Sequence, residues 1–180
     1  VIRSRMVRVP KGEVVKSRLV VQDLKSRWQP EGGELFAATP VLGVQRLLLS
    51  LASYHVRRNP SYRGGLLDVT QAFTHAYLGD DEDVLILLPD ELHGREIVLE
   101  DGTVWTIDTS VPHRVHRALY GYRASPKLWQ RHLVQVLTAE LPPELRLVQS
   151  RLDPCLFYNT DRAMYLLVYV DDMLFFAPVE

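Results

Sequence analysis

The sequence predicts an α+β fold in which an antiparallel sheet packs on helices. Short apolar runs that end at turn residues alternate with two longer segments whose apolar residues have helical spacing. Several neighbouring runs are close enough together to form hairpins, and hairpins require antiparallel neighbours rather than a doubly wound parallel sheet. With 180 residues, 47% of them hydrophobic, the chain can bury a core as one domain or as two closely packed subdomains.

The first predicted strand, residues 14–21, lies in the most basic part of the chain. Its period of two places Lys16 and Arg18 on one face. Residues 1–63 contain 12 Lys and Arg against 4 Asp and Glu, whereas residues 64–112 contain 1 against 11. A basic segment suits contacts with phosphates, because neutralising phosphate charge releases counterions. A solvated basic surface is the alternative that charge alone leaves open.

Two helices are predicted, and each starts at a polar residue followed by proline. The pairs Thr39-Pro40 and Ser125-Pro126 both match an N-cap with proline at the first helical position. We expect the first helix to end before Asn59-Pro60 and the second to stop at Pro142-Pro143. Apolar residues with helical spacing form the stripes Val41, Val44, Leu48, Leu51 and Ala52, and Leu128, Trp129, Leu133, Val136 and Leu137.

Short apolar runs predict strands between and after these helices. Residues 64–69 are expected to form a short buried strand with Asp68 near its end, and residues 84–88 form a second strand. Residues 96–108 are predicted to form a hairpin, in which Asp101-Gly102 supplies the positive φ angles of a tight primed turn.

Two adjacent carboxylates, Asp171 and Asp172, separate the last two predicted strands. Like charges this close repel each other, and bulky apolar neighbours raise the cost of ionising both. A divalent cation would compensate, since Mg²⁺ prefers carboxylate oxygens. If the strand that carries Asp68 lies beside this hairpin, three carboxylates can share a pair of cations. A plain hairpin turn and a strand-end cap are the alternatives that these residues leave open.

The single cysteine, Cys155, excludes an internal disulfide and lacks the paired spacing of a zinc site. We therefore expect a reducing intracellular compartment. No apolar run approaches the roughly 20 residues that a membrane-spanning helix needs, and the start of the chain does not resemble a signal peptide. Both ends are expected to continue in a longer protein.

Five blocks of the chain resemble the reverse transcriptase domain of copia-type retrotransposon polyproteins, in the order in which that family has them. The resemblance covers nearly all of the chain. It departs from the family pattern at Gln22-Asp23, where Arg-Gly is usual, and at Gln71, where Asn is usual. The blocks are KSRLVVQD (16–23), FAATPVLGVQRLLLSLA (36–52), LLDVTQAFTHAYL (66–78), RALYGYRASPKLW (117–129), and DPCLFY (153–158) with LLVYVDDML (166–174).

This resemblance implies a polymerase palm, with an antiparallel sheet packed on helices, and part of the fingers subdomain without a thumb. Residues 1–63 would be mainly fingers, and residues 64–180 would be palm, including the 94–108 hairpin and the 125–141 helix. The implied activity is that of an RNA-directed DNA polymerase, which transfers dNTPs onto a primer 3′-hydroxyl by two-metal chemistry. The implied cofactor is a pair of Mg²⁺ ions, with Mn²⁺ as the alternative.

The resemblance also assigns roles to single residues. Phe73 would exclude the 2′-hydroxyl of a ribonucleotide by a steric clash. Catalysis and metal binding are implied for Asp68, Asp171 and Asp172, with the backbone carbonyl of Val69 as a further metal ligand. Nucleotide binding is implied for Lys16, Arg18, Phe73, Tyr120, Gly121 and Ser125, and template or primer contacts for Pro126 and Tyr169.

The implied partners are an RNA or DNA template, a primer, dNTPs, and the remaining parts of the polyprotein, namely protease, integrase and RNase H. No membrane is implied, and the implied location is a cytoplasmic particle, the nucleus or both. One alternative is a truncated or degenerate relic that folds but only binds nucleic acid or is inactive. Another is a different palm-type nucleotidyltransferase, such as a cyclase.

Overall fold

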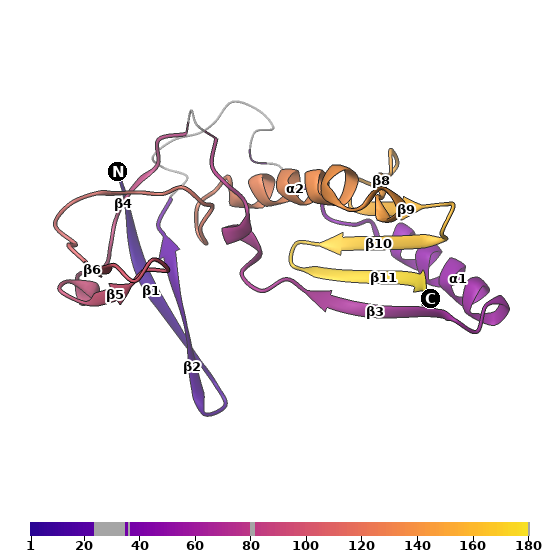
Figure 1. Cartoon of the computed structure of the whole chain (residues 1–180), viewed down its shortest axis with the longest axis horizontal. Helices are drawn as coiled ribbons and strands as arrows, with labels where there is room; N and C mark the ends of the chain where they lie inside the picture. Colours follow the sequence, from indigo (N-terminus) through magenta and orange to yellow (C-terminus); the bar gives the residue numbers. More distant parts are fainter. Residues whose placement is uncertain (24–34, 36, 80–81, 180) are drawn as a thin grey trace. The chain divides into compact units, whose positions relative to one another are not determined.

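A computed structural model describes residues 1–23, 35, 37–79 and 82–179 (Figure 1). The predicted α+β class is confirmed, since the described residues form mostly sheet with two α-helices. The chain divides into two compact units, and each unit combines two segments of the chain. Unit 1 comprises Val1–Leu35 and Phe73–Leu128, and unit 2 comprises Phe36–Ala72 and Trp129–Glu180.

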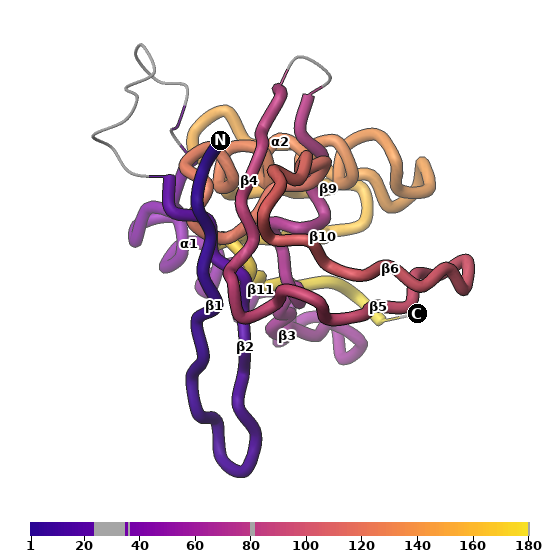
Figure 2. Tube along the Cα trace, turned by 90° about the vertical axis from the view of Figure 1, so that its left-hand side faces the viewer, coloured from indigo at the N-terminus to yellow at the C-terminus, as the bar shows by residue number. Residues whose placement is uncertain are grey.

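Unit 1 is built on a four-stranded sheet with the order β2-β1-β4-β7. Strands β1 (Ile2–Lys11) and β2 (Val14–Val21) form a long antiparallel hairpin (Figure 2), which confirms the strand predicted at residues 14–21. Strand β1 also pairs in parallel with β4 (Leu85–Leu87), which pairs antiparallel with β7 (His113–Arg114).

A second hairpin in unit 1 joins β5 (Glu96–Val98) to β6 (Val104–Thr106), as predicted. The predicted primed turn at Asp101-Gly102 is wrong. The Gly102 amide donates to the Leu99 carbonyl (2.9 Å), and within this turn only Gly102 has a positive φ, of 82°. The hairpin is therefore closed by a longer turn that ends at Gly102. This turn needs a positive φ at one position only, and glycine occupies that position because it has no Cβ.

The core of unit 1 forms where two segments distant in sequence run side by side. Tyr77 and Arg117 form an antiparallel bridge, and the Ala118 amide donates to the Ala76 carbonyl (2.9 Å). These contacts bury a small cluster that includes Leu128. Short 3-10 turns flank this region and β4, at η1 (Ala72–His75) and η2 (Asp90–Leu92).

Unit 2 contains a five-stranded antiparallel sheet with the order β3-β11-β10-β9-β8 (Figure 1). Three consecutive residues of the central strand, Leu166, Leu167 and Val168, are buried, so this strand is covered on both faces. The strands are β3 (Tyr62–Asp68), β8 (Val148–Gln149), β9 (Leu156–Asn159), β10 (Met164–Tyr169) and β11 (Asp172–Pro178).

Helix α1 (Leu42–Arg58) packs on one face of this sheet, where Leu48 joins Cys155 and Leu167 in a buried cluster (Figure 1). The predicted helix and its end before Asn59 are confirmed. Burial of Leu48 and Ala52 also agrees with the predicted stripe.

The predicted N-cap at Thr39 is wrong. The cap position is Val41, whose amide donates to a carboxylate oxygen of Asp153 (3.0 Å). Asp153 is buried and also accepts from the Cys155 amide (2.8 Å). An acid more than 100 residues away therefore satisfies the start of the helix in place of the local threonine, because it is held close by the sheet.

The second helix, α2 (Ser125–Gln135), continues as a π-helical turn, η3 (Val136–Glu140), and a 3-10 turn (η4, Pro143–Leu145) follows. This agrees with the predicted extent of 125–141. The predicted N-cap role of Ser125 is wrong, because Ser125 is already the first helical residue; its buried hydroxyl donates to the Leu119 carbonyl (2.7 Å).

The predicted buried strand at 64–69 is present, but it is not buried. Strand β3 forms the edge of the sheet, and Leu66 is 79% exposed. Its two glycines make room for aromatic rings of β11, since a Cβ on Gly64 would overlap the Phe176 ring and one on Gly65 the Phe175 ring. An edge strand has one hydrogen-bonded neighbour, which leaves the rest of its surface open.

The two units do not follow the predicted boundary after residue 63. Helix α1 belongs with the later strands of unit 2, because its apolar face packs on β9 and β10. The segment 73–128 belongs with the N-terminal hairpin, because β4 pairs with β1. Among the described residues, no helix is both long and apolar enough to cross a membrane.

Candidate active site

Three polar residues form a row across three neighbouring strands of unit 2. Asp172 is the Cα partner of Asp68 on β3 and also of Tyr169 on β10. Cross-strand partners lie about 4.5–5.5 Å apart and point to the same face of the sheet. Both carboxylates are exposed, and Tyr169 is 53% exposed. The fold therefore places two of the three predicted acids side by side on an accessible surface.

The third acid, Asp171, lies in the two-residue turn between β10 and β11. Its backbone carbonyl accepts a hydrogen bond from the Val69 amide (3.0 Å), so the end of β3 is tied to this turn. Asp171 is half-buried, whereas its neighbour Asp172 is exposed. All four predicted metal ligands, Asp68 and Val69 on one side and Asp171 and Asp172 on the other, thus lie at one end of the sheet.

Carboxylates that face each other across a sheet repel each other unless a cation lies between them. In the described part of the chain, no group of three or more His, Cys, Asp or Glu side chains is arranged to hold a metal ion by itself. Mg²⁺ is commonly held by one or two carboxylates, with water and substrate phosphates as the other ligands. The oxygen-only donor set of Asp68, Asp171 and Asp172 fits that kind of site.

These acids come from two segments that lie far apart in the sequence and adjacent in the sheet. No protein-family model matches the chain, and no solved structure matches it. The chemistry of the site is therefore inferred from the residues of this chain.

A second group of predicted site residues lies within unit 1. The Arg18 guanidinium carbon is 5.3 Å from the centre of the Tyr120 ring, and the Phe73 ring centre is 5.1 Å from it. The Val21 amide donates to the Tyr120 carbonyl (2.7 Å), which fixes this segment against the end of β2. Lys16 is exposed two residues before Arg18 on the same strand. Three of the predicted nucleotide-binding residues, Arg18, Phe73 and Tyr120, are thus in contact, and Lys16 lies on the same strand as Arg18.

The backbone beside Tyr120 passes very close to β2. Gly121 has a φ of 85°, and a Cβ at this position would overlap the Val21 carbonyl oxygen. Glycine is therefore required both by the backbone conformation and by the available space. The buried hydroxyl of Ser125 donates a hydrogen bond to the Leu119 carbonyl, next to Tyr120 in the chain. Pro126 is half-buried in the first turn of α2.

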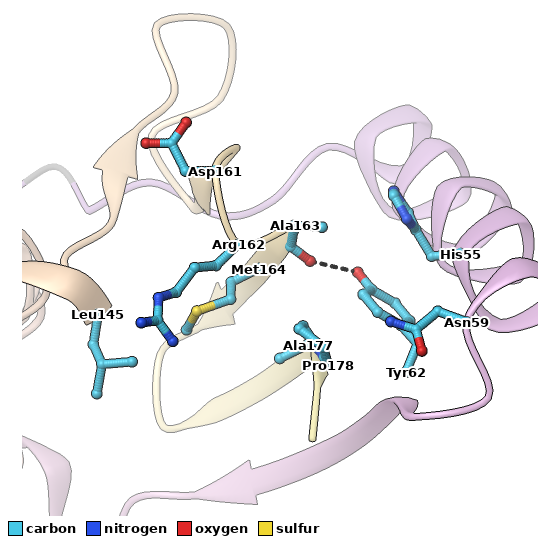
Figure 3. A pocket seen from close by; sticks show the side chains of 10 residues that line it. All are labelled: His55, Asn59, Tyr62, Leu145, Asp161, Arg162, Ala163, Met164, Ala177 and Pro178. Atoms are coloured by element: carbon cyan, nitrogen blue, oxygen red, sulfur yellow. Dashed lines mark hydrogen bonds between the residues drawn. The ribbon is translucent and has the colours of Figure 1, made fainter. Parts of the chain in front are cut away.

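A cavity of about 520 Å³ lies at the other end of the unit 2 sheet, away from the acids (Figure 3). The Tyr62 hydroxyl donates to the Ala163 carbonyl (2.8 Å) in its wall, and the Tyr62 ring stacks on His55. Tyr62 pairs with Pro178, at the end of β3 and β11 that is opposite Asp68 and Asp172. The lining residues are His55, Asn59, Tyr62, Leu145, Asp161, Arg162, Ala163, Met164, Ala177 and Pro178.

Two residues of unit 2 make long-range contacts that the sequence analysis did not anticipate. In the sequence, Asp153 is only the first residue of the block at 153–158. In the structure, its carboxylate accepts from the Val41 amide at the start of α1. Trp129 was one member of a helical stripe, yet its indole N–H donates to the Val170 carbonyl (2.7 Å) beside the paired acids. A buried tryptophan usually finds a partner for its N–H, which was the available signal for Trp129.

Proposed function

We propose that this chain is the fingers-and-palm part of a copia-type reverse transcriptase, an RNA-directed DNA polymerase. The observation that carries the proposal is the pairing of Asp68 with Asp172, with Asp171 on the adjoining turn. A two-metal nucleotidyltransferase needs carboxylates that converge from separate strands in this way. The five sequence blocks that resemble the copia family support the same function.

In this proposal the carboxylates of Asp68, Asp171 and Asp172, with the carbonyl of Val69, hold two Mg²⁺ ions. When bound, the ions lower the pKa of the primer 3′-hydroxyl and neutralise charge on the triphosphate. The 3′-hydroxyl would lose its proton to water as its oxygen forms a bond to the α-phosphorus, and the bond between that phosphorus and the departing pyrophosphate would break. The task of the protein in this transfer is to position the groups and to compensate charge.

The group around Tyr120 would bind the incoming nucleotide. Arg18 and Lys16 present cations from β2, and a guanidinium suits bidentate contact with phosphate oxygens. The contact of Arg18 with the Tyr120 ring restrains the long side chain, which lowers the entropy lost on binding. Phe73 packs against the same ring and would exclude a 2′-hydroxyl.

Primer extension tests this function directly. The 180-residue chain is incubated with Mg²⁺, dNTPs and primed RNA or DNA templates. We expect extension that requires the metal and that Asp171→Asn abolishes. Asp161→Asn, which alters an exposed acid in the turn between β9 and β10, is the matched control and should extend primers like the parent.

Two results would contradict the proposal. The first is extension by Asp171→Asn at the rate of the parent, which would remove the carboxylate from the reaction. The second is binding of primer–template without extension in the presence of Mg²⁺, which would instead identify an inactive relic that retains only nucleic-acid binding.

A further inference from the structure

The turn that carries Asp171 has a backbone conformation that valine rarely adopts. Val170 has a φ of 57°, in the left-handed region. A β-branched residue is strained there, and such a conformation persists only when the surrounding structure holds it. The turn therefore needs contacts that fix it from outside the hairpin.

Trp129 supplies one such contact. It is buried, with 5% of its surface exposed, and its indole N–H donates to the Val170 carbonyl at 2.7 Å. That carbonyl belongs to the peptide group that precedes Asp171. The peptide group that follows Asp171 is also held, because its carbonyl accepts from the Val69 amide (3.0 Å). Both peptide groups that flank Asp171 are thus anchored, one by Trp129 of α2 and one by Val69, the residue that follows β3.

We infer that Trp129 is a positioning residue for the paired acids: its indole N–H holds the Val170 peptide so that the turn presents Asp171 and Asp172 beside Asp68. The link to catalysis rests on the proposed polymerase function, whereas the effect on the turn does not. Trp129 does not touch substrate in this role. Its action passes through one hydrogen bond to the backbone.

A tryptophan that only fills the core would stabilise the whole unit equally, whereas a positioning residue would act on the turn in particular. The two roles can be separated by removing the N–H while keeping the ring. Replacement of Trp129 by 3-benzothienylalanine, in which sulfur takes the place of the N–H, preserves the bicyclic shape. Trp129→Phe is a second variant, and Trp105→Phe is the matched control, because Trp105 lies on the separate β5–β6 hairpin.

Amide hydrogen exchange measured by NMR gives a readout that is independent of activity. The Val69 and Asp172 amides report on the turn, and the Leu167 amide reports on the centre of the sheet. Loss of one hydrogen bond is expected to speed exchange at Val69 and Asp172 about 3- to 10-fold relative to Leu167. Trp105→Phe should leave this ratio unchanged. Equal acceleration at all three amides, or none, would overturn the inference.

Val170→Gly provides a rescue, since glycine adopts a positive φ without strain. In the Val170→Gly background, loss of the indole N–H should change the exchange ratio less than half as much as in the parent. An undiminished effect would show that the bond does not act through the Val170 conformation and would overturn the inference.

The Mg²⁺ dependence of primer extension then tests the link to catalysis. We expect the benzothienylalanine variant to need about 3- to 10-fold more Mg²⁺ for half-maximal extension. The same Mg²⁺ requirement as the parent would overturn the link between the positioning by Trp129 and catalysis. If the parent itself extends no primer, the proposed function fails, while the exchange ratio still decides whether Trp129 positions the turn.

Discussion

Asp68 lies directly opposite Asp172 at the point where β3 ends and β11 begins. Like charges in this arrangement destabilise an antiparallel pair, and the neighbouring Asp171 adds a third negative charge. A structural hairpin gains nothing from such a cluster, whereas a cation site requires it. Under the proposed function, the acids that cost stability in the metal-free chain would be the ones that bind the metal.

The first prediction is that Asp68→Asn stabilises the metal-free chain. Removal of one charge from the facing pair should raise the free energy of unfolding by about 0.2–1 kcal/mol. Under the proposed function, the same substitution should reduce primer extension by at least about 100-fold, because it would remove a ligand of the metal ions that stabilise the transition state. Urea unfolding in EDTA measures the first effect, and primer extension the second.

Added Mn²⁺ supplies the control for this prediction. The parent should unfold at higher temperature with Mn²⁺ than with EDTA, since a ligand that binds only the folded state stabilises it, and Asp68→Asn should show a smaller shift. Equal shifts of the unfolding temperature in both proteins would show that Asp68 is not a ligand of the bound Mn²⁺.

The second prediction separates backbone conformation from steric overlap at Gly121. Gly121→Ala should destabilise unit 1 by more than the roughly 1–3 kcal/mol typical of a strained backbone, because its Cβ would also overlap the Val21 carbonyl oxygen. Gly102→Ala is the matched control, since Gly102 has nearly the same φ, 82° against 85°, and open space around it. Thermal unfolding compares the two, and equal losses would argue against a close approach at Gly121.

The sequence was informative where the pattern was local and repetitive. Strand β2, helix α1 and the β5–β6 hairpin follow from their apolar spacing and turn residues. It was misleading where a long-range partner replaced a local one. Thr39 has a side chain that can cap a helix. At this helix end, however, the Val41 amide donates to the buried carboxylate of Asp153.

The candidate site shows the same division. The paired acids stand out because two charges between apolar strands need an explanation. The role of Trp129 could not be read from its place in the helix stripe, because the partner is a backbone carbonyl 41 residues away. The exposure of Leu66 was likewise hidden, since an apolar run does not tell an edge strand from a central one.

The third prediction concerns the choice between deoxyribonucleotides and ribonucleotides. Under the proposed function, Phe73→Val removes the ring that packs on Tyr120 and should reduce discrimination against rNTPs by about 10- to 200-fold. Phe73→Tyr keeps the ring and should keep the discrimination. Single-nucleotide extension with dNTP and rNTP measures the ratio of kcat/KM, and an unchanged ratio in Phe73→Val would remove Phe73 from the nucleotide site.

The fourth prediction is a pH dependence at the far end of the same sheet. Burial, with a smaller contribution from the neighbouring Tyr165, raises the pKa of Tyr62 from 10.0 to about 12. The unfolded chain therefore releases this proton at lower pH than the folded chain. The stabilisation from Tyr62 is complete below pH 10 and is lost as the pH rises from 10 to 12.

Tyr62→Phe should accordingly lower the free energy of unfolding at pH 7 but reduce its loss at alkaline pH. At pH 7 it loses the hydrogen bond to the Ala163 carbonyl and about 1 kcal/mol of stability. Between pH 10 and 12 its free energy of unfolding should fall less steeply than that of the parent, because no buried phenol remains to be ionised at this position. Tyr54→Phe, which alters a half-exposed ring on α1, is the control and should follow the parent across this range. Parallel curves for Tyr62→Phe and the parent would show that the Tyr62 phenol does not control alkaline unfolding of unit 2.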